Sequence, residues 1–395
     1  MEVEESASSV LHGDLLECVL LCVQPDELAA SPALVSWEWR RAARAVQLRR
    51  CRGRGHRASL VAHVQGAYTG CSTHVYDPRR RAWGSDGAHV MGALPVQRCC
   101  CAGGDRVYTL SLVSMTISAD ALGAAWCELP PPRVWRVDPV VAVVGPRVVV
   151  LGGGCGATAI AGVVEVLDEA GWTTCAPMPT PLASRWVSAV ASERRVYVVE
   201  RRSGWASWFD PVTRQWGPAR QLQLPGGHAA ESWAACGVMK SGDGADERLL
   251  VLAGGRRAGG GGIKAVVLWD VDGNTLQLDA EGNDHEMPAE MSERLFGADG
   301  GAINIGVAAA AAAESGYVYN ASGPSKGAVM YEMVAAGVGG GGEDSSKKQC
   351  YYEKRRRSSR WEWEWLPCPS PAAAPASSSA VVVFACSISS AAPNK

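Results

Sequence analysis

The feature that most constrains the fold of this chain is an internal repeat of about 45 residues, which begins near residue 58. Each unit holds an arginine followed by a short apolar run, and a tryptophan that follows a turn. The arginines are Arg106, Arg147, Arg195 and Arg248, and the tryptophans are Trp83, Trp126, Trp172 and Trp216. A period in the forties with several short strands per unit is typical of the blades of a β-propeller.

The repeat predicts a mainly β fold of about six blades. The 395 residues include 45 Gly and 15 Trp, which suits many short strands joined by glycine turns. The units span 58–96, 97–132, 133–182, 183–228, 229–290 and 295–370. A last apolar run at 380–385 is expected to pair within the first blade and close the ring, so the propeller domain would occupy 58–390. Low-complexity insertions near 308–313 and 337–360 predict loops, and five or seven blades remain alternatives.

A helical pattern occupies residues 10–50, between a tail at 1–9 and a linker at 51–57. Its apolar residues recur at helical spacing, and two prolines divide it into three short helices. A segment this small rarely buries enough surface to be stable alone. It is therefore either a docking element for a partner or a cap that packs on the main domain.

The residues of this segment resemble the F-box. The chain matches its pattern with Asp14-Leu15-Leu16, then Pro25-Asp26-Glu27-Leu28, then Val35-Ser36 and Trp39-Arg40. His12 departs from the family, which usually has proline there, and Gln24-Pro25 is a variant of its Leu-Pro step. The resemblance implies that a Skp-type adaptor binds Leu11, Asp14, Leu15, Leu16, Val19, Leu20, Pro25, Leu28, Val35 and Trp39.

The repeats themselves resemble the kelch repeat, most fully at Gly153-Gly154, Trp172 and Pro177-Met178-Pro179. F-box proteins with kelch propellers are numerous in plants. The resemblance implies the substrate receptor of a cullin-based SCF ubiquitin ligase, whose propeller holds a client protein. Some similar members turn over enzymes of phenylpropanoid and flavonoid synthesis. The alternative is a kelch scaffold for protein interactions without a ligase role.

Candidate client-binding residues lie just before the predicted innermost strands of successive blades. They are Arg98, Arg136, Arg185, Trp186, Glu231 and Trp233. Arginine and tryptophan at a channel mouth suit protein recognition, because arginine donates paired hydrogen bonds and tryptophan adds contact area. In kelch proteins that bind partners, an arginine at this position commonly lines the ligand pocket. The alternative is that these residues only brace neighbouring blades.

The sequence gives little support to catalysis. It holds no HExxH or P-loop motif and no CxxC pair, so we expect neither a cofactor nor a metal. The formal net charge of −2 indicates neither nucleic acid nor a membrane as a partner. An acidic start without an apolar run predicts a cytoplasmic or nuclear protein. Basic clusters at 40–57 and 347–357 leave nuclear import open.

Overall fold

The computed structural model describes residues 13–23, 39, 42, 46, 59–65, 71–78, 80–89, 98–102, 105–122, 126–154, 158–184, 186–225, 230–240, 247–256, 264–279, 285–297, 302–309, 314–335, 359–368 and 381–387. The chain divides into two compact units. One unit comprises Met1–Ala58 with Ile388–Lys395, and the other comprises Ser59–Ser387.

Helix α1 (Gly13–Leu20) is the longest described element of the first unit. Leu16 and Leu20 are four residues apart, so they lie on one face of the helix. Both are buried, and they pack in a small core with Ala42 and Val46. Leu15, on the neighbouring face, leaves 61% of its surface exposed.

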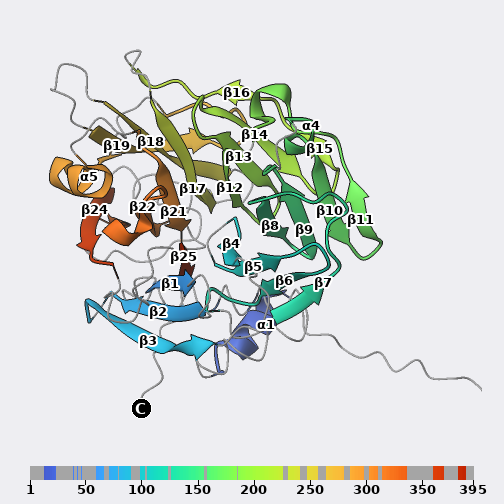
Figure 1. The fold of residues 1–395 in the computed structure, drawn as a ribbon, viewed down its shortest axis with the longest axis horizontal. Helices are drawn as coiled ribbons and strands as arrows, with labels where there is room; N and C mark the ends of the chain where they lie inside the picture. The colour runs from blue at the N-terminus through green and yellow to red at the C-terminus, as the bar shows by residue number, and fades with distance from the viewer. Residues whose placement is uncertain are drawn as a thin grey trace, which may run out of the picture. The chain divides into compact units, whose positions relative to one another are not determined.

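The second unit is built from six antiparallel sheets (Figure 1). Blade one contains β1 (Ser59–Gln65), β2 (Cys71–Asp77), β3 (Ala82–His89) and β25 (Val381–Ser387). Blade two contains β4 (Arg98–Cys100), β5 (Val107–Leu110), β6 (Met115–Ser118) and β7 (Trp126–Leu129). Blade three contains β8 (Val140–Val144), β9 (Arg147–Leu151), β10 (Val164–Asp168) and β11 (Gly171–Thr174).

Blades four to six continue the order. Blade four contains β12 (Val187–Ala191), β13 (Val196–Glu200), β14 (Trp205–Asp210), β15 (Gln215–Trp216) and β16 (Arg220–Gln221). Blade five contains β17 (Ser232–Lys240), β18 (Glu247–Arg256), β19 (Lys264–Asp272) and β20 (His285–Glu286). Blade six contains β21 (Ile305–Ala309), β22 (Ser315–Asn320), β23 (Ala328–Ala335) and β24 (Ser359–Leu366). The prediction of six blades is confirmed.

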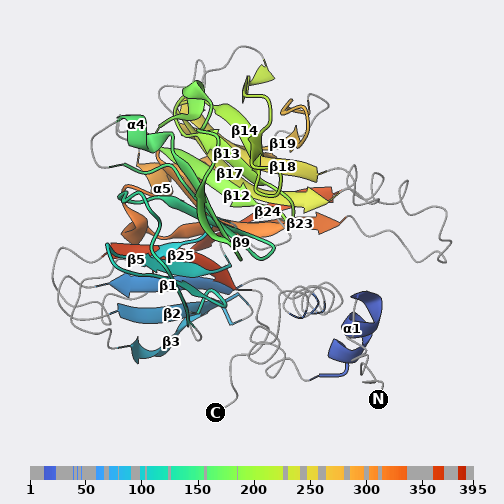
Figure 2. The same cartoon turned by 90° about the vertical axis from the view of Figure 1, so that its right-hand side faces the viewer.

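The first strand of each sheet from blade two onward, together with β25, forms the inner ring. β25 contacts β4 on one side and β21 on the other, and contacts between β8, β12, β17 and β21 continue the circle. A parallel bridge between Ala102 and Ala142 joins blades two and three. β25 also pairs with β1 along its whole length, from Ser59 opposite Ser387 to Gln65 opposite Val381 (Figure 2). The predicted closure of the ring within the first blade is therefore confirmed.

The periodic tryptophans connect neighbouring blades. The indole Nε1 of Trp172 donates to the carbonyl of Pro130 at 2.9 Å, and that of Trp216 donates to Ala176 at 3.1 Å. Trp83 donates to Pro367, in the segment after β24, at 2.7 Å. Each bond joins an outer strand to the chain that leaves the preceding blade. The repeat that marks the blades in the sequence therefore also holds them together.

Two segments differ from the expectation. Ala308 and Ala309 fall in an expected loop, but they are the buried last residues of β21, because they extend the apolar strand begun at Ile305. Ser359 and Arg360 likewise begin β24 and pair with β23. Helix α5 (Ala289–Phe296), which the repeat pattern does not predict, buries its last two residues in the core beside β19 and β22.

Candidate recognition surface and channel cavity

The described candidate client-binding residues lie at or near the start of the inner strands, as their spacing predicts. Arg98 is the first residue of β4, and Glu231 immediately precedes β17. Arg136 and Trp186 lie in the segments that enter β8 and β12. Arg185 and the side chain of Arg98 lie outside the described residues.

Arg136 is completely buried, which differs from the expectation of an exposed ring. Its guanidinium donates to Glu165 Oε2 at 2.6 Å and to the carbonyl of Val163 at 2.7 Å. The Glu165 carboxylate also accepts from the backbone N–H groups of Arg133 and Val134. Burial lowers the pKa of Arg136, and the charge of Glu165 opposes that shift. The buried side chain of Arg136 therefore fixes the segment 133–137 to β10.

Trp233 is also buried, with 3% of its surface exposed. Its backbone N–H donates to the carbonyl of Arg201 at 2.7 Å. Its indole packs so closely on Gly204 that a Cβ on that glycine would lie 2.7 Å from Nε1. Arg136 and Trp233 are therefore internal braces: Arg136 holds the segment that enters β8 against β10, and Trp233 packs on the turn of blade four.

Three apolar side chains are exposed at this rim, beside charged ones such as Glu231 and Asp138. Trp186 exposes 58% of its surface, Val137 46% and Trp135 38%, and we call these three residues the rim patch. Two glycines of the turn after β9 pack against the two segments that carry the patch, Gly152 against the segment of Trp186 and Gly153 against that of Val137. A Cβ on Gly152 would lie 2.9 Å from Val187, and one on Gly153 would lie 2.5 Å from the carbonyl of Val137.

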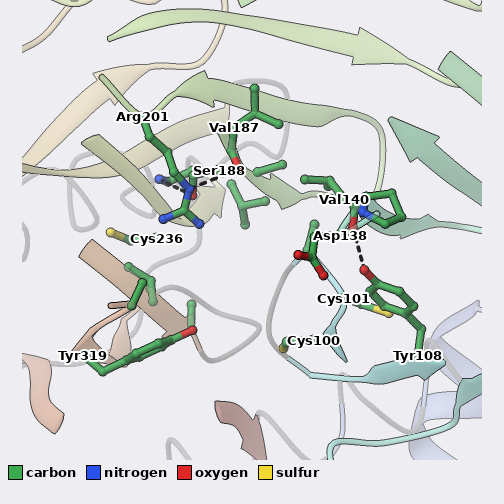
Figure 3. Close-up of a pocket in the computed structure, with 18 of the residues that line it drawn as sticks. Cys100, Cys101, Tyr108, Asp138, Val140, Val187, Ser188, Arg201, Cys236 and Tyr319 are labelled. Atoms are coloured by element: carbon green, nitrogen blue, oxygen red, sulfur yellow. Dashed lines mark hydrogen bonds between the residues drawn. The ribbon is translucent and has the colours of Figure 1, made fainter. Parts of the chain in front are cut away.

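A cavity of about 390 Å³ lies among the inner strands of blades two to six (Figure 3). Much of its wall consists of small or apolar side chains from β8, β12, β17 and β21. Its polar groups include Arg201, Ser188 and Asp138. The Tyr108 hydroxyl, also in the wall, donates to the carbonyl of Pro139 at 2.5 Å.

Arg201 enters this cavity from a turn that departs from the repeat. Where blade three has its glycines, blade four has Glu200-Arg201-Arg202-Ser203. The Glu200 carboxylate accepts from the backbone N–H groups of Arg202 and Ser203 at 3.0 and 2.6 Å, and from the Ser184 hydroxyl at 3.3 Å. A carboxylate thus closes the turn by hydrogen bonds, and the next side chain points toward the channel (Figure 3). The repeat pattern alone did not assign Arg201 to the site.

The candidate adaptor residues divide between two environments. Leu16 and Leu20 form the core of the small unit, and Trp39 packs against it. Leu15 and Val19 are exposed, at 61% and 40%. Asp14 lies in α1, but its side chain is outside the described residues, as are Leu11, Pro25, Leu28 and Val35.

No cluster of potential metal ligands occurs among the residues that the structure describes. None of the described helices combines the length and apolarity needed to cross a membrane. The eight cysteines whose side chains the structure describes are free thiols.

The fold and the surface define a closed six-bladed β-propeller that presents ordered aromatic segments at one rim. No family profile matches the chain. The F-box/kelch-repeat protein At1g23390 of Arabidopsis thaliana is 31% identical over 311 residues, which cover 74% of this chain and 73% of that protein. The chain belongs to the F-box/kelch-repeat proteins.

Three solved structures resemble the chain at low TM-score and low sequence identity. Hydrazine synthase of Kuenenia stuttgartiensis has a TM-score of 0.36 at 12% identity, over 75% of this chain and 80% of that chain. A putative 6-phosphogluconolactonase of Bacteroides fragilis has 0.36 at 10%, over 70% and 90%. A complex of KlAtg21 with the coiled coil of AgAtg16 has 0.38 at 10%, over 60% and 66%. Scores this low carry no functional inference.

Proposed function

We propose that this chain is the substrate-recognition subunit of an SCF-type ubiquitin ligase. The N-terminal unit docks a Skp-type adaptor that is carried by a cullin, and the propeller binds a client protein. The chain makes no covalent bond itself. It contributes proximity, because a client held beside the ubiquitin donor reacts at a raised effective concentration. Membership in the F-box/kelch-repeat proteins supports this role.

The division of helix α1 into two apolar faces is the observation that carries the proposal. Leu16 and Leu20 already supply the core of the small unit. Leu15 and Val19 are additional apolar side chains that the described core does not use. An apolar face left exposed on a small helical unit is typical of a protein interaction site.

The rim patch supports client binding by the propeller. Trp186 is held on both sides, since its N–H donates to Ser184 Oγ at 3.0 Å and its carbonyl accepts from the N–H of Arg201 at 2.9 Å. A tryptophan presented on an ordered backbone loses little conformational entropy on binding, and tryptophan is enriched among residues that dominate interfaces. The chain acts in the cytoplasm or the nucleus, and its resemblance to similar members proposes an enzyme of phenylpropanoid or flavonoid synthesis as the client.

A pull-down with a purified Skp-type adaptor tests the proposal. Leu15→Ala/Val19→Ala removes the exposed face and leaves the leucine core intact, so it separates docking from folding. Leu112→Ala/Val113→Ala is the matched control, because it truncates an equally apolar pair on the propeller, exposed at 71% and 78%. We expect the wild type and the control to bind and the α1 variant to lose binding.

Two results would refute adaptor docking through this face. One is undiminished binding by the α1 variant, and the other is no binding by the wild type. The second result would leave a kelch scaffold that binds proteins without a ligase.

A further inference from the structure

Arg201 occupies an unusual electrostatic position in the propeller. Two of its five N–H groups donate to backbone carbonyls, Nε to Val187 at 3.2 Å and Nη1 to Ile305 at 2.7 Å. These carbonyls begin the inner strands of blades four and six, so the guanidinium links those two blades by hydrogen bonds. Among the described residues no carboxylate lies within ion-pair distance of it.

Other arginines in the body of the propeller have acidic partners. Arg136 pairs with Glu165 at 2.6 Å, and Arg248 pairs with Asp270 and Asp279 at 2.8 and 2.7 Å. The carboxylate next to Arg201 in sequence, Glu200, is occupied by its own turn. Removing a guanidinium from water without a counter-charge is unfavourable, and arginine does not escape by losing its proton. Burial accordingly lowers the pKa of Arg201, against an opposing effect of Tyr319.

The cavity around Arg201 has the size and composition of a small-molecule site. Its volume of about 390 Å³ falls within the range of about 300–1,000 Å³ that is common for such sites. Val187, Val190 and Val307 contribute apolar walls, and alanines leave the space open. Ser188 lines the cavity, and its hydroxyl oxygen accepts from the N–H of Ala235 at 3.1 Å, which leaves the hydroxyl able to donate its own proton.

We propose that this cavity binds a small organic carboxylate with an apolar body, whose carboxylate pairs with Arg201. A planar guanidinium with free N–H groups matches a carboxylate in geometry as well as in charge. The backbone contacts that hold Arg201 arrange these donors before the ligand arrives. The inference goes beyond the proposed function, because a free acid binds here without adaptor or client.

Titration of the full chain with benzoate, followed by calorimetry and ligand-observed NMR, tests the assignment. Benzamide is the neutral ligand of the same shape. We expect saturable benzoate binding and no benzamide binding by the wild type. Arg201→Met should weaken benzoate binding at least about tenfold, as expected for losing a charge-assisted pair. Arg202→Met is the matched control, since this neighbouring arginine is exposed, and it should bind as the wild type does.

Two further variants cover the case in which Arg201→Met does not fold. Arg201→Lys keeps the charge but loses the planar donors, and it should weaken binding several-fold. Ala189→Leu keeps Arg201 and fills the cavity, and it should abolish binding. The proposal is overturned if wild-type protein does not bind benzoate at about 10 mM, or if benzamide or Ala189→Leu binds equally well. If the protein binds acetyl-glutamate amide but does not bind benzoate, the proposal of a free small acid is overturned. The site would then be assigned to an acidic side chain of a client protein.

Discussion

Breaking the buried pair between Arg136 and Glu165 should destabilise the propeller strongly. Arg136→Met removes the cation but leaves the carboxylate, which is 0% exposed, with only two backbone N–H donors. An uncompensated buried charge of this kind costs about 3–5 kcal/mol. Because unfolding entropy is about 2.1 cal/mol/K per residue, that loss over Ser59–Ser387 lowers Tm by about 4–7 °C.

The double variant Arg136→Met/Glu165→Gln tests the cause. Glutamine removes the stranded charge and keeps an oxygen to accept a backbone N–H, so about half of the lost stability should return. Arg256→Met is the control, because it breaks a largely exposed pair with Glu231 at 3.1 Å and should cost less than about 1 kcal/mol. Calorimetry and urea unfolding monitored by tryptophan fluorescence measure both quantities. A single variant as stable as the control, or a double variant no better than the single, would refute the reasoning.

Three further outcomes follow from the same contacts. Gly153→Ala should lower Tm by several degrees, because the new Cβ would lie 2.5 Å from the carbonyl oxygen of Val137. Gly171→Ala is the control, since Gly171 has a positive φ as well but no atom within 4 Å of the new Cβ, and equal Tm shifts in calorimetry would contradict the prediction. Trp172→Phe deletes the bond to the preceding blade and should cost about 1 kcal/mol beyond its lost packing area, which urea unfolding checks against Trp186→Phe at the exposed rim. The backbone N–H of Ala170 and the side chain of Arg214 hold the pKa of Asp168 below its usual value, so Asp168→Asn should be less stable than the wild type at pH 7. The difference in Tm should shrink as the pH falls below the ordinary aspartate pKa of about 3.9, and a pH-independent difference would refute the reasoning.

The blades could be predicted because their evidence is periodic. Trp83, Trp172 and Trp216 recur because each fills the same contact with the preceding blade, so their spacing carries the architecture directly. The closing strand could be predicted because one apolar run is left over after the last unit, and the edge of β1 is left without a neighbouring strand. Pairing the two completes the first blade.

The direction of single side chains could not be predicted in the same way. Spacing placed Arg136 at the start of an inner strand but did not show that it turns inward, since its partner Glu165 lies 29 residues away on another strand. The assignment of Arg201 was missed for the opposite reason. Its turn breaks the repeat, and only the folded chain shows that the deviation carries a cation into the channel. In the small unit, helical spacing predicted an apolar helix but did not separate Leu15 from Leu16.

The pairing of β25 with β1 has a consequence for biosynthesis. The first strand of the propeller to leave the ribosome waits for a neighbour encoded more than 300 residues later, from Ser59 to Val381. Every shorter nascent or cleaved product that ends before Val381 therefore carries an open sheet edge, which is a template for aggregation and for capture by chaperones. Only after β25 has been translated can the propeller close and the chain stop exposing a sheet edge to chaperones.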